Sequence, residues 1–140
     1  MPALSARLAE IVDALPLRPG MRVLEIGCGP GAAAREVARR IGDGHIQAVD
    51  RSATAIAQAR AASGKEIASG RMSLRHVAVE DFELVPGEQP FDLAFAIRVG
   101  ALDGRHPEIE RRARQRIAAA LTPEGRLLVD GGDPLKEVEL

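Results

Sequence analysis

The apolar residues of this 140-residue chain first recur at every third or fourth position and later gather in short runs. The early spacing predicts an amphipathic helix over residues 5–15, with Ser5 as its N-cap. The later runs have the length of strands. They lie at residues 22–26, 45–49, within 72–79, at 91–97 and at 126–129.

Helical patterns separate these strands. They lie between residues 32 and 41, between Ser52 and Gly64, and between Pro107 and Pro123. We expect residues 64–70 to be irregular. Strand and helix thus alternate five times, which predicts right-handed crossovers and a parallel sheet with helices on both faces. The prediction is therefore a single doubly wound α/β domain over residues 1–140.

The first strand leads into a turn with glycines at alternate positions, Gly27, Gly29 and Gly31, and then into a helix. This arrangement places bare backbone N–H groups and a helix N-terminus at one edge of the sheet, where an anion or a cofactor can bind. The turn also fits the dinucleotide pattern G-x-G-x-x-G/A, and a plain strand-to-helix connection is the alternative. Glu25 makes the pattern more specific, because a carboxylate there repels phosphates and attracts an ammonium group.

Glu25-x-Gly27-x-Gly29-x-Gly31 resembles the first motif of the class I S-adenosylmethionine (SAM) dependent methyltransferases. The resemblance extends from Arg22 to about Asp130. It implies a Rossmann-like sheet with strand order 3-2-1-4-5. It also implies that the glycine turn lies against the methionyl end of SAM, that Glu25 binds near the amino group, and that S-adenosylhomocysteine (SAH) is the product.

Acidic residues follow the second and third strands. Asp50 lies 19 positions after Gly31, a separation at which an acid commonly binds ribose hydroxyls, although it can also cap the helix that follows. The resemblance implies that an acid after the third strand binds the adenine amino group, and Asp81 is our choice. Phe82 either forms a wall for the adenine or packs in the core.

Two residues after the fourth strand are candidates for the reaction itself. Arg98 either holds an anionic substrate or the SAM carboxylate, or pairs with Asp103 or Glu25. His106 is the one histidine that we consider as a general base, and an ordinary solvated loop histidine is the alternative. We expect His45 at the far end of the sheet and His76 to be a packing residue.

The predicted cofactor site gathers residues from four segments, and no metal-ligand set is assigned. It comprises Glu25, Gly27, Cys28, Gly29, Gly31, Asp50, Arg51, Glu80, Asp81, Phe82 and Arg98.

Composition narrows the classes of partner. Apolar residues make up 46% of the chain, charged residues 28%, and the net charge is −1, which makes nucleic acid an unlikely main partner. No apolar run approaches the ~20 residues of a membrane span. The start of the chain, Met1–Arg7, lacks the apolar stretch of a secretion signal, and Cys28 is the sole cysteine. We therefore expect a cytoplasmic protein.

These features predict a methyltransferase that acts on a small molecule. The Asn-Pro-Pro-Tyr motif, which many family members that methylate amide or base nitrogens carry after the fourth strand, is not found there. A non-catalytic SAM-binding protein, or a subunit completed by another chain, is the second interpretation. A domain that binds NAD is the third, and Glu25 disfavours it.

The family usually adds two strands after the fifth, and they are missing from this sequence. We therefore expect the strand at residues 126–129 to form the sheet edge, with residues 136–140 as a partial cover. An apolar edge recruits other chains, so we expect a homodimer.

Overall fold

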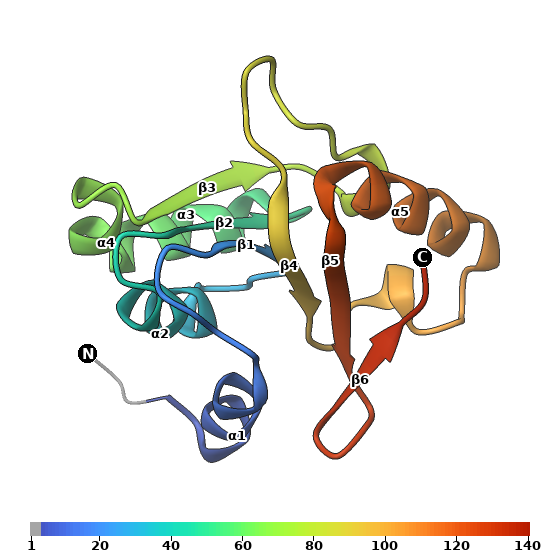
Figure 1. Cartoon of the computed structure of the whole chain (residues 1–140), viewed down its shortest axis with the longest axis horizontal. Helices are drawn as coiled ribbons and strands as arrows, with labels where there is room; N and C mark the ends of the chain where they lie inside the picture. Colours follow the sequence, from blue (N-terminus) through green and yellow to red (C-terminus); the bar gives the residue numbers. More distant parts are fainter. Residues whose placement is uncertain (1–3) are drawn as a thin grey trace.

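The computed structural model describes residues 4–140 and contains one six-stranded sheet (Figure 1). Its strands are β1 (Arg22–Ile26), β2 (His45–Asp50), β3 (Met72–His76), β4 (Phe91–Ala96), β5 (Leu121–Asp130) and β6 (Leu135–Val138). The helices are α1 (Ala6–Ala14), α2 (Ala32–Arg40), α3 (Ala53–Ala62), α4 (Gly64–Ala68) and α5 (Pro107–Ala120). Two short 3₁₀ turns are η1 (Val79–Asp81) and η2 (Gly100–Leu102).

The strand order is β3-β2-β1-β4-β5-β6. The first five strands are parallel, so the predicted α/β fold with order 3-2-1-4-5 is confirmed. β1 lies near the centre of the sheet, between β2 and β4. The change in direction of the strand order at β1 leaves a crevice outside the carboxyl ends of the strands, which is where ligands bind in such sheets.

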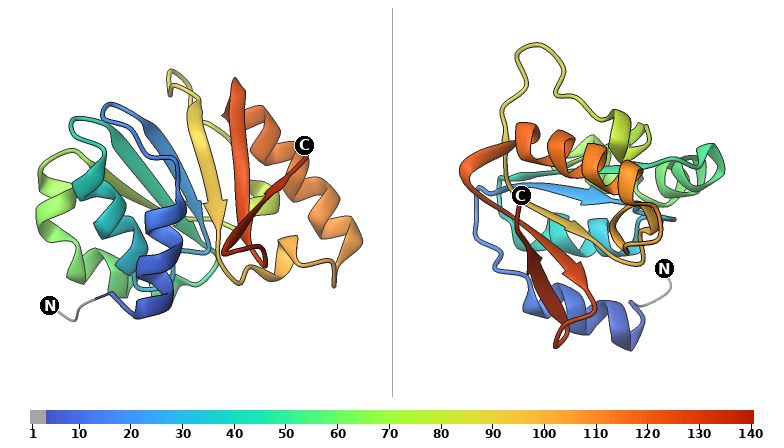
Figure 2. Two further views of the ribbon diagram at one scale, coloured as in Figure 1. Left: turned by 60° about the horizontal axis from the view of Figure 1, so that its bottom comes forward. Right: turned by 90° about the vertical axis from the view of Figure 1, so that its right-hand side faces the viewer.

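Each face of the sheet has its own apolar core. One core joins alternate sheet residues such as Val23, Ile46 and Phe95 to α1, α2 and α3, and the other joins Leu24 and Ala94 to α5. Figure 2 shows α5 on one side of the sheet and α1 and α2 on the other. The alternation of side chains along each strand therefore decides which face a functional residue can reach. Within residues 4–140, no helix is long and apolar enough to cross a membrane.

Two local predictions are wrong. Residues 64–70, expected to be irregular, contain the helical turn α4, and its Ile67 packs against the first core. The last helix stops at Ala120 rather than near Pro123, and β5 already begins at Leu121, beside Phe91 of β4. The strand can contain a proline because the pairing of β4 with β5 is irregular there, so a ladder hydrogen bond is not required at every residue.

The expected sheet edge is also corrected. β5 is not the edge, because β6 pairs with it antiparallel from Leu127↔Val138 to Asp130↔Leu135. Residues 136–138 of the anticipated partial cover thus form most of a strand, and Arg126 Nε is 2.9 Å from Glu137 Oε1 across the pair. The argument that an exposed β5 demands a homodimer therefore loses its basis.

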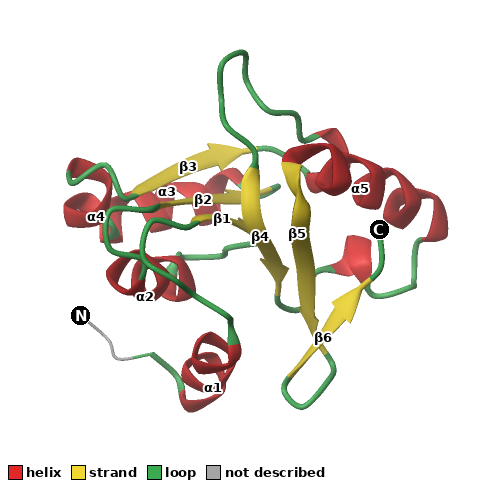
Figure 3. Cartoon of the chain, viewed as in Figure 1, coloured by secondary structure: helices red, strands yellow, loops and turns green. Residues whose placement is uncertain are grey.

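The connection from η1 to β4 has no helix, and Figure 3 shows it as a long loop. It begins at Phe82, whose side chain is 1% exposed and lies 6.4 Å, centroid to centroid, from Phe91. The Arg75 guanidinium lies over the Phe82 ring, 4.9 Å from the ring centroid. Phe82 thus anchors the loop in the second core, as its packing interpretation predicts.

We expect Phe82→Ala to lower the free energy of unfolding by about 3–5 kcal/mol, because a fully buried aromatic ring is lost and a cavity is left. Urea unfolding followed by circular dichroism measures the change. Val85→Ala in the same loop is the control, since Val85 is 50% exposed and should change stability by less than about 0.5 kcal/mol. Equal effects of the two substitutions would contradict a core role for Phe82.

Candidate functional site

The glycine turn after β1 is held by its neighbour β2. Gly27, Gly29 and Gly31 have backbone φ values of +71°, +54° and +89°, which residues other than glycine rarely adopt. Val49 O accepts hydrogen bonds from Gly27 N at 2.8 Å and from Cys28 N at 3.0 Å. The turn is therefore a fixed backbone feature at the carboxyl end of the sheet.

Glu25 lies beneath this turn with its side chain 3% exposed. It shares the strand face of Val23 and so points toward α2. Its Oε1 atom is buried and has no hydrogen-bond partner among the described residues. The pKa of Glu25 is raised to about 8, chiefly by burial and also by the nearby Asp50 carboxylate, while the Arg35 guanidinium acts in the opposite direction.

Arg35 is a residue of the site that our sequence analysis missed. It is 6% exposed, and its Nη1 group donates to Pro30 O at 2.7 Å and to Ser63 Oγ at 3.1 Å. Ser63 is fully buried at the junction of α3 and α4. Arg35 therefore ties the glycine turn to the next helical layer. Its position one helical turn after Gly31 was the available signal, because helical side chains point back toward the N-terminus.

Asp50 links two loops through both oxygens of its carboxylate. Oδ2 accepts from Gly29 N at 2.9 Å, and Oδ1 accepts from Ser52 N at 2.8 Å. Ser52 itself caps α3 through a 3.1 Å hydrogen bond from Ala55 N to its Oγ. The unliganded structure thus uses Asp50 to hold the glycine turn and the start of α3 together.

A cavity of about 620 Å³ opens at the carboxyl ends of β1, β2 and β4. Six of the residues singled out from the sequence line it, namely Gly27, Asp50, Arg51, Glu80, Arg98 and His106. The remaining lining is largely apolar and includes Val77, Val79 and Ile109. The other predicted site residues lie outside the cavity wall.

The acidic pair after β3 is divided by the fold. Glu80 lines the cavity, whereas Asp81 lies outside it and pairs with Arg112 of α5, with Arg112 Nη2 at 2.9 Å from Asp81 Oδ1. Sequence spacing gave no means to choose between the two, because η1 rotates successive side chains to different directions.

Arg98 adopts φ +57°, and no other non-glycine residue of the described chain has a positive φ. Its backbone N–H donates to Asp130 Oδ1 at 3.0 Å, which joins the ends of β4 and β5. Its side chain forms no ion pair with Asp103 or Glu25. Asp103 instead accepts the backbone N–H of Arg105 at 3.1 Å and pairs with its side chain at 2.7 Å, and these contacts lower the pKa of Asp103. Arg98 is exposed and lines the cavity.

The three histidines occupy different surroundings. His106 is exposed and precedes α5 at the cavity. His76 is not buried, and its Nε2 lies 3.0 Å from Arg51 O at the carboxyl end of the sheet, so its prediction as a packing residue is wrong.

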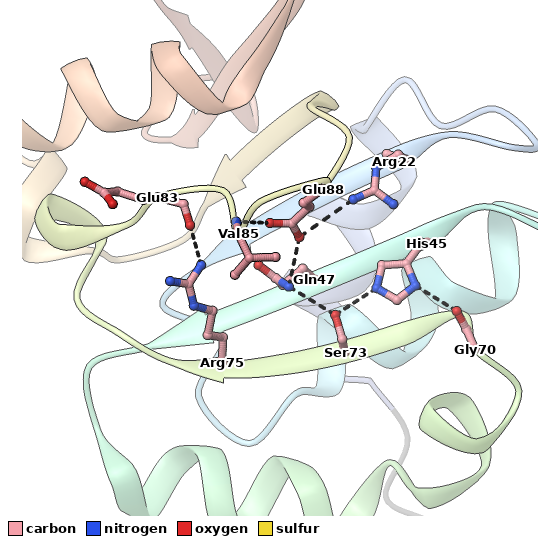
Figure 4. Close-up of polar contacts among 9 residues, drawn as sticks. All are labelled: Arg22, His45, Gln47, Gly70, Ser73, Arg75, Glu83, Val85 and Glu88. Atoms are coloured by element: carbon pink, nitrogen blue, oxygen red, sulfur yellow. Dashed lines mark hydrogen bonds and ion pairs between the residues drawn. The ribbon is translucent and has the colours of Figure 1, made fainter.

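His45 lies at the opposite end, as predicted, 2.7 Å from Gly70 O and 2.8 Å from Ser73 Oγ. Figure 4 shows this polar network, in which Gln47 and Glu88 continue the contacts toward Arg22. The network fastens the loop that precedes β4 onto the face of β2 and β3.

Cys28 is a small buried residue of the turn. The pKa of its thiol is raised to about 12, chiefly by burial and then by the neighbouring Glu25 and Asp50. The thiolate that nucleophilic chemistry requires is therefore disfavoured.

The site fits SAM. The orphaned Oε1 of Glu25 lacks the cation that a ligand ammonium supplies. The glycine turn leaves open space at Gly29, where a Cβ would meet no atom within 4 Å. The cavity that Gly27 lines has a volume suited to a cofactor of this size, and its two acids, Asp50 and Glu80, lie beside an apolar wall.

Comparisons with known proteins agree with this geometry. Residues 23–125 match a family described as a methyltransferase domain. The chain is 29% identical over 129 residues to trans-aconitate 2-methyltransferase of Delftia acidovorans, covering 92% of this chain and 44% of that protein. It is 36% identical over 129 residues to protein-L-isoaspartate O-methyltransferase of Methylorubrum extorquens, covering 91% and 49%.

A similar solved structure is a SAM-dependent methyltransferase from Geobacter sulfurreducens in complex with SAH. The two structures match with a TM-score of 0.67 and 23% sequence identity, and the matched region covers 91% of this chain and 48% of the Geobacter chain. The chain spans about half the length of the curated relatives that it matches. Since the family match covers well over half of the chain, this protein belongs to the methyltransferase-domain family, and it has the Rossmann-like fold of the similar solved structure.

Proposed function

We propose that this chain is the SAM-binding part of a methyltransferase that transfers a methyl group to a small organic acceptor. The observation that supports this most is the buried, unpartnered carboxyl oxygen of Glu25 beneath a rigid glycine turn. A cation is its natural partner, and SAM presents an ammonium group at its methionyl end. One relative is named for trans-aconitate and another for protein L-isoaspartate, so both small-molecule and protein acceptors occur among the relatives.

The proposed roles follow from position. Glu25 attracts the ammonium group, and the bare backbone of Gly27 to Gly31 admits the methionyl chain. Asp50 takes the ribose hydroxyls, for which it would give up a hydrogen bond to Gly29 N or Ser52 N. Glu80 takes the adenine amino group in preference to Asp81, because Glu80 faces the cavity. Arg51 and Arg98 form the rim of the cofactor cavity.

SAM, if bound here, would supply a methyl group on a positively charged sulfur; an acceptor lone pair would form the new bond to that carbon while the S–CH₃ bond electrons would pass to sulfur. The chain's own residues would contribute mainly by positioning the two reactants. His106 is the available group at the cavity for removing a proton from an acceptor that carries one.

A SAM-binding subunit without activity of its own is the second candidate. It is the second interpretation of the sequence, and assays of binding and of activity distinguish it from the first. Calorimetry with SAM, SAH and NAD tests the cofactor, and a methyl-transfer screen with labelled SAM tests activity. Binding of SAM without transfer to any acceptor would favour the second candidate. Binding of NAD alone would contradict both.

Cytoplasmic location and a homodimer are also proposals. With β5 covered, the edge strands of the sheet are β3 and β6, and β6 has only four residues and carries Lys136 and Glu137. Short charged edges resist pairing, so a dimer through this edge would be weak. Sedimentation velocity at micromolar concentration checks it, and a concentration-independent species near 14.9 kDa would exclude the dimer.

We expect Gly29→Val to weaken SAH binding at least tenfold in a folded protein, because a β-branched residue at φ +54° distorts the turn. Gly87→Val is the matched control. Gly87 also has a positive φ, +86°, and also has open space at its Cβ, but it lies in the loop before β4. Isothermal calorimetry measures both dissociation constants. Parent-like SAH binding by Gly29→Val would move the cofactor site elsewhere.

We expect SAM binding to release a proton at pH 7. The pKa of Glu25 is about 8 in the unliganded protein, so the group is mostly protonated, and a ligand ammonium favours its ionised form. The apparent affinity should rise from pH 6 to pH 8 by up to about tenfold per unit. Calorimetry in buffers of different ionisation enthalpy detects the released proton.

Glu25→Gln is the control, because it cannot ionise. In the parent protein without ligand, the pKa of Glu25 is raised from 4.5 in the unfolded chain to about 8 in the folded chain. The protonated carboxyl therefore contributes stability that is fully present below pH 4.5 and is lost as the pH rises through 8. The parent should therefore lose stability relative to Glu25→Gln over that interval. A pH-independent affinity with no buffer effect would show that Glu25 does not face the ammonium group.

A further inference from the structure

A second hollow adjoins the cofactor cavity. It has a volume of about 390 Å³ and lies at the carboxyl ends of β4 and β5. The two hollows share Arg98, Val99 and Arg105 as a common wall. A ligand in one hollow is therefore separated from a ligand in the other by the side chains of a single short segment.

This wall stands directly at the glycine turn. A Cβ atom on Gly27 would lie 2.6 Å from Val99 Cγ2, so Val99 packs against the bare backbone of the turn. The second hollow therefore begins where the methionyl end of a bound cofactor is expected. This is the place that a methyl acceptor must occupy.

The floor of the second hollow is apolar and its rim is charged. Ala96, Val99, Leu102 and Val129 provide the apolar surface. Ala96 of β4 pairs with Val129 of β5, and Val129 pairs with Lys136 of β6. These three residues therefore lie in one row across the three strands. Arg98, Asp103, Arg105, Asp130 and Lys136 complete the lining.

The charges on the rim are unevenly compensated. Asp103 is 2.7 Å from Arg105 and neutralises it. Asp130 accepts the backbone N–H of Arg98 at 3.0 Å and lies 3.8 Å from Arg7.

Arg98 and Lys136 have no carboxylate partner within residues 4–140. Lys136 instead extends over the β5–β6 turn, with its Nζ 3.8 Å from the place of a Cβ on Gly131. Two uncompensated cations thus flank an apolar floor.

We propose that the second hollow binds the methyl acceptor and that the acceptor is an organic acid, with its carbon frame on the apolar floor and a carboxylate held by Arg98 and Lys136. This rests on the proposed function, because it places the acceptor beside a bound cofactor. Arg98 then serves the acceptor rather than the SAM carboxylate. Lys136 acts from β6, which the sequence alone did not place at the site.

The test titrates the SAH-loaded chain with hexanoate, benzoate and adipate and with their amides of equal length, by ligand-observed NMR. Carboxylates should bind roughly tenfold tighter than the matched amides. Arg98→Gln and Lys136→Gln should each weaken carboxylate binding by about two- to fivefold, the range of exposed ion pairs, and Lys136→Gln should leave SAH binding unchanged.

Arg111→Gln and Lys65→Gln remove the same charges from exposed positions outside both hollows, and should have no effect. Equal binding of acids and amides would overturn the proposal, as would equal losses in the control variants. A loss of SAH affinity in Arg98→Gln would assign Arg98 to the cofactor instead. Failure of the parent to bind SAH at the outset would refute the proposed function itself.

Discussion

The carboxyl group of Glu25 imposes the constraint on which the site depends. It sits at the end of the central strand, nearly without solvent contact, and one of its oxygens has no hydrogen-bond partner in the described chain. Leaving a polar group in this state costs free energy in the unliganded protein. That cost is recovered when a cation approaches, so the arrangement stabilises the complex more than the free protein. This cost is the basis on which we propose Glu25 as the site of a ligand ammonium group.

The surrounding residues fix where the cation can approach. Asp50 holds Gly29 from the side of β2, and Arg35 holds Pro30 from the side of α2. The two contacts set the turn in its positive-φ conformation before any ligand arrives, so less ordering entropy is lost on binding. They also act oppositely on Glu25, since the Asp50 charge raises its pKa and the Arg35 charge lowers it. The same two side chains therefore control both the shape and the protonation of the site.

The sequence revealed the strands and the glycine turn because these depend on local periodicity and on a motif with a steric cause, whereas the strand order followed from the resemblance to a family. It could not distinguish Glu80 from Asp81, since the choice depends on the rotation of one 3₁₀ turn. It missed Arg35, whose partners Pro30 and Ser63 come together only through packing. It also placed the sheet edge wrongly, because four residues of β6 gain their stability from pairing with β5 rather than from their own pattern.

The position of β6 changes what the carboxyl end of the sheet can do. By pairing with β5 it carries Lys136 into register with Val129, next to the segment where Arg98 takes its left-handed conformation. That conformation costs about 1–3 kcal/mol for a non-glycine residue and persists here with its N–H bonded to Asp130. The acid that could neutralise Arg98 is thus engaged by its backbone, and the guanidinium stays free. The carboxyl end of the sheet therefore carries positive charge toward β5, whereas the acid Glu25 is buried beneath the turn after β1, an asymmetry that the proposed cationic donor and anionic acceptor would match.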